Sequence, residues 1–173
     1  LPRSSEGWWP TWSKIEIFGR EELKSYDKKI YFDLDLVIQG DIQCILNHDA
    51  EWAAIHATWK GVPFKMRNPG ESLINTSVMV WKDNTSIYDR WESDWRNIVK
   101  NYRGTDYWYH KNKMVPSTLP KVFYSYREGS KPIHYWDNDF QPYLKYQSEY
   151  SVCLFHQKPE IHDLDKDNIL YRI

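Results

Sequence analysis

The chain has 173 residues, which fits one domain with a core of its own, and residues 1–173 are expected to form a single domain. Its formal net charge of -1 provides no overall field that would attract nucleic acid, so nucleic acid is not an expected partner. No apolar run is long enough to cross a bilayer and no signal-like leader opens the chain, so we expect no membrane span and a cytoplasmic location.

Helical and strand patterns alternate along the chain. In chain order, the expected elements are a helix at 11–23, a strand at 29–38, a short helix or turn at 42–46, strands at 52–59 and 72–81, helices at 86–102 and 104–112, and strands at 122–126 and 152–155. The helices are assigned from apolar residues that recur every three or four positions, and the strands from apolar runs bounded by glycine and proline. This alternation predicts an α/β fold with a mostly parallel sheet.

Several residue types in this chain are expected to fill its core. Aromatic residues make up 17% of the chain, including ten tryptophans. Aromatic rings also stack on sugars and bases, but Trp91 and Trp95 stand at helical spacing among charged residues, so we interpret them as the apolar anchors of an amphipathic helix. Cys44 and Cys153 lie far apart in apolar segments and are expected to be buried thiols.

Two aspartates, Asp33 and Asp35, interrupt the apolar run at 29–38. Charges in such a run are costly unless something compensates them, and residues two apart on a strand point to the same side. A divalent cation would relieve their repulsion, and carboxylate oxygens suit Mg²⁺ or Mn²⁺. Such a metal would neutralise charge that develops on a leaving diphosphate. The alternative is a strand end that carries two solvated aspartates.

Four segments, in order, resemble the GT-A glycosyltransferases. Residues 26–42 resemble the DxD segment of that family, 12–18 the helix before it, 73–81 the strand with the N-S-G/S-V-M pattern, and 152–159 the closing segment with a histidine. The resemblance covers nearly the whole chain and implies a Rossmann-like GT-A fold. It also implies a metal-dependent glycosyltransferase that moves a sugar from a nucleoside-diphosphate sugar to an acceptor that the sequence does not identify.

The resemblance further implies roles for individual residues. The implied metal ligands are Asp33, Asp35 and His156, with Asp33 either binding the metal or contacting the ribose. The implied donor-binding residues are Lys14, Asp33, Asn75 and Lys158, and Asp106 is the implied catalytic residue near the donor sugar and acceptor. Each has a structural alternative when taken alone: a core histidine, a surface lysine, a strand bulge or a helix cap.

Two departures from the family pattern stand out. The family opens with a strand-helix-strand unit that grips the nucleotide base, and too few residues precede Gly7 to supply it, so an N-terminally truncated fold is expected. Gln157 stands where the family often has glycine and would crowd the approach of the phosphates. Two other functions stay open: a haloacid-dehalogenase-like phosphatase with Asp33 as nucleophile and Asp35 as general acid, or a non-catalytic binding module derived from a transferase.

Overall fold

The computed structural model describes residues 10–57, 59, 73–82, 85–114, 117–127, 129, 144–155 and 159–173. The 3₁₀ helices are η2 (Pro10–Gly19), η3 (Glu21–Leu23) and η5 (Ile161–Asp163). The α-helices are α1 (Gln43–Leu46), α3 (Thr85–Asn101), α4 (Thr105–Lys111) and α5 (Ile169–Arg172). The strands are β1 (Lys29–Phe32), β2 (Leu36–Ile38), β3 (Trp52–His56), β4 (Ile74–Trp81), β5 (Ser117–Thr118), β6 (Phe123–Ser125) and β7 (Val152–Leu154).

The described strands form two sheets, with the orders β1-β4-β3-β5 and β2-β7-β6. Strand β4 pairs antiparallel with β1 and β3, and β2 pairs antiparallel with β7. The pairs β3–β5 and β6–β7 are parallel. The α/β class is confirmed. The predicted predominance of parallel strands is not confirmed, because antiparallel pairs outnumber parallel pairs in the part of the chain that the structure describes.

The expectation of one buried strand at 29–38 is wrong. Strand β1 ends at Phe32 and β2 begins at Leu36, and the two strands belong to different sheets. Between them the chain bends through Asp33 and Asp35, and the side chain of Leu34 at the tip is 98% exposed. The bend avoids the desolvation that two carboxylates would suffer inside a paired, buried strand.

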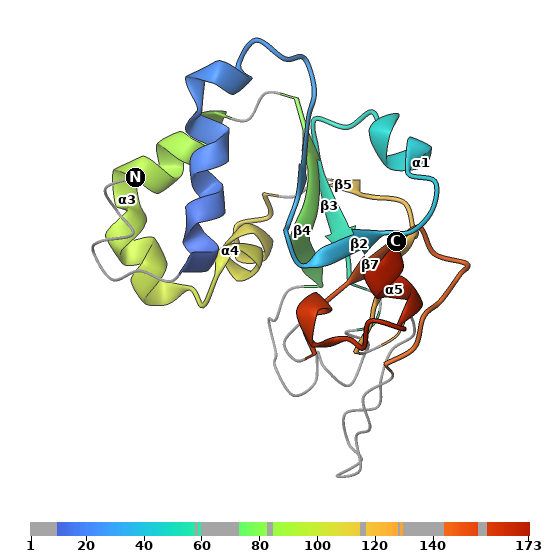
Figure 1. Ribbon diagram of the computed structural model, residues 1–173. Helices are drawn as coiled ribbons and strands as arrows, with labels where there is room; N and C mark the ends of the chain where they lie inside the picture. Colours follow the sequence, from blue (N-terminus) through green and yellow to red (C-terminus); the bar gives the residue numbers. More distant parts are fainter. Residues whose placement is uncertain are drawn as a thin grey trace.

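The helix expected at 11–23 consists of two 3₁₀ helices, η2 and η3. A 3₁₀ helix repeats every three residues, so Trp12, Ile15 and Phe18 lie along one face of η2, and all three are buried. This face packs against α3 and α4, which stand with η2 on one side of β4 (Figure 1). The apolar residues at 12, 15 and 18 therefore do mark a helix, but their spacing of three is that of a 3₁₀ helix and not of an α-helix.

Stacked indole rings join these helices. Trp12 of η2 stacks on Trp91 of α3 with ring centroids 5.0 Å apart, and Trp108 of α4 packs edge-on to Trp91 at 6.1 Å. All three tryptophans are buried, so the prediction of aromatic helix anchors is confirmed for Trp91. Among the described residues, no helix is long and apolar enough to cross a membrane.

The cysteine expectation is half right. Cys153 is buried in β7, where it packs against aromatic side chains, but Cys44 is exposed. Cys44 lies on α1, a short surface helix that buries only Ile45, so its apolar sequence neighbours did not report its own environment.

Candidate functional site

Asp33 lies at the centre of a hydrogen-bonded cluster where β1 ends. The Lys14 ammonium from η2 donates to both of its carboxylate oxygens, at 3.0 Å to Oδ1 and 2.9 Å to Oδ2. The Tyr31 hydroxyl donates to Oδ1 of the same carboxylate at 2.5 Å. The Lys14 and Asp33 side chains are only 15% and 19% exposed. This burial makes their ion pair stronger than an exposed pair of the same geometry.

A bulge in β4 brings a second acidic residue to this cluster. Ala54 of β3 pairs with Met79, but the next residue, Ile55, pairs with Asn75, so the segment between the two β4 residues bulges out of the ladder. Thr76 in the bulge donates to Asp106 Oδ1 of α4 from its backbone N–H, at 3.1 Å, and from its hydroxyl, at 2.5 Å. Bulges commonly re-aim side chains beside functional sites.

The two acidic residues are linked through one threonine. The Lys14 ammonium, bound to Asp33, lies 3.4 Å from the carbonyl oxygen of Thr76 and donates to it. Asp106 does not cap its own helix, whose N-cap is Gly104, so the helix-cap alternative does not hold. The structure thus brings Lys14, Asp33 and Asp106 together, although they are far apart in the sequence.

Asn75 lies next to this network in the β4 bulge. Its side-chain Oδ1 accepts a hydrogen bond from the Ser77 N–H at 3.0 Å, and the residue is buried. The Ser77 carbonyl in turn accepts from the Asp33 N–H at 2.7 Å. Asn75 therefore shapes the bulge beside the end of β1, and its contact with a donor sugar stays a prediction.

Asp35 has a different environment from Asp33. The residue as a whole is exposed, yet partial enclosure of its carboxyl group raises the pKa of Asp35, and the neighbouring Asp33 carboxylate adds to this effect. Burial, the hydrogen bond to Asp33 and the charges of both aspartates raise the pKa of Tyr31, so its hydroxyl stays protonated and can donate. Asp35 is thus an accessible carboxylate whose ionised form a cation would stabilise.

Residues 156–158 lie outside the described residues. They include the predicted site residues His156 and Lys158, and Gln157, which stands where the family often has glycine. The neighbour of His156, Phe155, is described, and its backbone N–H donates to the Asp35 carbonyl at 2.9 Å. Within the described ranges, no group of three or more His, Cys, Asp or Glu side chains is placed to hold a metal. The described part of the proposed ligand set is therefore the pair Asp33 and Asp35.

Two residues of the cluster, Tyr31 and Thr76, were not predicted from the sequence. Tyr31 of β1 stands two positions before Asp33, and because residues two apart on an extended chain point to the same side, this spacing could have identified it. Thr76 had no such signal, because its contact with Asp106 depends on a bulge and on the packing of α4 against β4.

Comparison with known proteins gives a fold but no family. No protein-family model matches the chain. No curated protein matches it either. Among solved structures, the chain is similar to the galactosyltransferase LgtC, determined in complex with donor and acceptor sugar analogs. The TM-score is 0.59 at 12% sequence identity, and the match covers 95% of this chain and 67% of LgtC. The chain therefore has a glycosyltransferase fold.

Proposed function

We propose that this chain is a metal-dependent glycosyltransferase that takes a sugar from a nucleoside-diphosphate sugar. The observation that carries the proposal is the cluster at the end of β1, where Lys14, Asp33 and Asp106 meet beside an exposed Asp35. The similarity to a galactosyltransferase fold supports a transferase over a phosphatase, for which Asp33 would be the nucleophile.

The described residues fit a divalent cation at Asp35. Oxygen ligands suit Mg²⁺ and Mn²⁺, and Asp35 is an accessible carboxylate in a partly desolvated place beside a second negative charge. When bound, such a cation would stabilise the negative charge of a leaving diphosphate. His156 joins the proposed ligand set because the residue before it, Phe155, is hydrogen bonded to the backbone of Asp35.

The remaining residues of the cluster hold this arrangement in place. Lys14 balances the charge of Asp33 and brings a cation to the edge where we place the diphosphate. The resemblance to the GT-A family adds Lys158 as a second proposed cation for the diphosphate. Asp106, fixed by two hydrogen bonds from Thr76, is the proposed residue at the sugar and acceptor. Such a fixed carboxylate needs little reorganisation when a substrate binds, which is the advantage of a preorganised site.

Melting temperatures measured with a panel of nucleoside diphosphates, with and without Mn²⁺, test this proposal. A ligand stabilises by binding the folded state, so we expect a larger rise for diphosphate and Mn²⁺ together than for the sum of their separate effects. Asp35→Asn should remove this extra rise. Asp89→Asn, which alters an exposed aspartate of α3, should keep it.

Equal shifts with and without Mn²⁺ would contradict the metal site. A phosphoryl group found on Asp33 after incubation with an aryl phosphate would instead establish the phosphatase. Release of nucleoside diphosphate from a nucleotide sugar, dependent on Mn²⁺ and on Asp35, would complete the case for transfer.

A further inference from the structure

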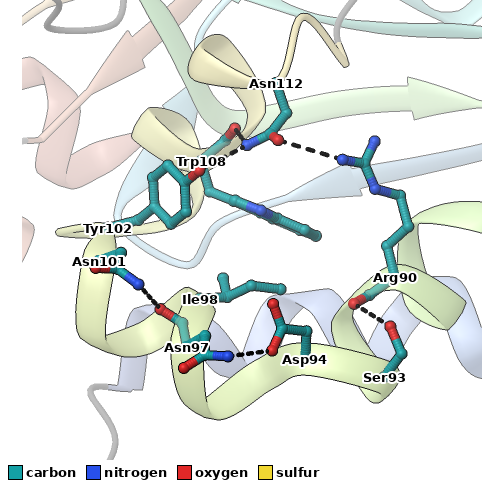
Figure 2. Close-up of a pocket in the computed structure, with 9 residues that line it drawn as sticks. All are labelled: Arg90, Ser93, Asp94, Asn97, Ile98, Asn101, Tyr102, Trp108 and Asn112. Carbon is teal, nitrogen blue, oxygen red and sulfur yellow. Dashed lines mark hydrogen bonds between the residues drawn. The ribbon is translucent and has the colours of Figure 1, made fainter.

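A second polar site lies between α3 and α4, lined by residues outside the cluster around Asp33. It is a pocket of about 350 Å³, within the range of roughly 300–1,000 Å³ typical of small-molecule sites. Its wall is mostly polar, and Figure 2 shows the side chains of α3 on one side facing Trp108 and Asn112 on the other. The polar lining residues are Arg90, Ser93, Asp94, Asn97, Asn101 and Asn112.

A break in α3 lies in the wall of this pocket. Asp94 has non-helical backbone angles, φ -144° and ψ 23°, which divide α3 into two helical segments. Arg90, Asp94, Asn97 and Asn101 recur at spacings of three and four, so they form one stripe along the helix. All four positions are exposed to solvent, whereas the apolar residues Ile87, Trp91 and Ile98 of the same helix are buried.

The polar side chains are held by one another, and the amides of Asn97 and Asn101 keep capacity for a ligand. Asn97 Nδ2 donates to Asp94 Oδ1 at 2.6 Å, and Asn101 Nδ2 donates to the backbone carbonyl of Asn97 at 2.8 Å. Across the pocket, Arg90 Nη2 donates to Asn112 Oδ1 at 3.2 Å. An amide carries two donor hydrogens and an acceptor oxygen, and the hydrogen bonds of the described residues use one donor hydrogen of Asn97 and one of Asn101.

We propose that this pocket binds a neutral saccharide unit. Sugar hydroxyls donate and accept at once, which matches a wall of amides with one guanidinium and one carboxylate. Ile98 and Trp108 lie beneath these polar groups and are almost wholly buried, so recognition would rest on hydrogen bonds from the polar side chains. The charges of Arg90 and Asp94 offset each other, so the lining favours neither a phosphate nor a metal cation.

The saccharide pocket is separate from the proposed transfer site. Its lining contains none of Lys14, Asp33, Asp35 and Asp106, although α4 carries both Asp106 and the lining residue Trp108. Binding here requires neither Mn²⁺ nor a nucleotide, so the pocket can be tested independently of transferase activity.

Titration of the ¹⁵N-labelled full chain, without metal or nucleotide, tests the proposal. The probes are methyl β-galactoside, methyl α-glucoside and methyl N-acetyl-β-glucosaminide, with inorganic phosphate as the anionic control. We expect saturable shifts of the side-chain amides of Asn97, Asn101 and Asn112 with at least one glycoside. The double variant Asn97→Ala/Asn101→Ala should weaken that binding about tenfold, since two hydrogen-bonding groups are lost.

The variants are chosen so that folding does not obscure the result. Asn97 and Asn101 are exposed positions of a helix, where alanine is well tolerated, and Lys100→Ala on the same turn is the matched control. The control should bind like the unaltered chain. The proposal is overturned if no glycoside produces saturable shifts, if phosphate alone produces them, or if the double variant binds as tightly as the control. A failed Mn²⁺ and diphosphate assay with intact glycoside binding would refute only the transferase proposal.

Discussion

Replacing Lys14 with methionine tests whether the ion pair with Asp33 holds the site together. Lys14→Met keeps a long apolar side chain but removes both hydrogen bonds to the Asp33 carboxylate and the bond to the Thr76 carbonyl. The side chains of Lys14 and Asp33 are 15% and 19% exposed. Loss of their ion pair should therefore lower the free energy of unfolding by more than loss of a surface pair does, but by less than the roughly 3–5 kcal/mol of a fully buried pair. We expect a loss of about 2 kcal/mol, in the range for hydrogen bonds to charged groups.

The matched control is Lys24→Met, which breaks a pair with Glu21 whose side chains are 49% and 80% exposed. Exposed pairs of this kind contribute little, so the loss should be about 0.5 kcal/mol or less. Urea unfolding measures both values, with an unchanged m-value as evidence that the unfolding transition is the same. In a chain of this length, 2 kcal/mol lowers the melting temperature by roughly 4–8 °C. Equal destabilisation by the two substitutions would refute the role assigned to the Lys14–Asp33 pair.

Three further expectations follow from buried contacts. Thr76→Val keeps the shape of the side chain but removes the hydroxyl that donates to the Asp106 carboxylate, so the free energy of unfolding should fall by about 2 kcal/mol. An unchanged urea midpoint would argue against this hydrogen bond. Gly19→Ala places a methyl group 2.6 Å from an aromatic ring of α3 and should lower the free energy of unfolding by about 1–3 kcal/mol. Gly104→Ala, with open space around it, should lose only the N-cap preference for glycine, about 1 kcal/mol or less in the same assay. Burial raises the pKa of the Cys153 thiol to about 12, so in the native chain a thiol reagent should modify the exposed Cys44 and spare Cys153. The contribution of the Cys153 thiol to stability should fall as pH rises from about 9 towards 12, because the thiol loses its proton at a lower pH in the unfolded chain than in the folded chain. Equal modification of both cysteines in the native chain would contradict that burial.

Local sequence patterns predicted most of the elements but not the way in which they pair. The spacing of Ile87, Trp91 and Ile98 correctly indicated α3, because burial on one face of a helix leaves a periodic trace in the sequence. The pairing of β4 with both β1 and β3 left no such trace, since strand neighbours are chosen by long-range packing. The two-residue strand β5 was too short to produce a pattern at all.

The site was predictable in the same uneven way. An aspartate pair within an apolar run identified Asp33 and Asp35, because such charges need compensation. The partner that compensates Asp33, Lys14, lies 19 residues away, and the resemblance alone suggested that both lie near a diphosphate. The contact of Asp106 with Thr76 was unpredictable, since it requires a bulge that follows from the register of β4 against β3.

The bend between β1 and β2 has a mechanical consequence. The Asp33 N–H is bonded to Ser77 of one sheet's longest strand, and the Asp35 carbonyl is bonded to Phe155, which follows a strand of the other sheet. A ligand bound to both carboxylates would therefore resist a relative movement of the two sheets. Conversely, we expect a small displacement between the sheets, such as one caused by repacking the core behind β7, to change the separation of the two carboxylates without altering either residue.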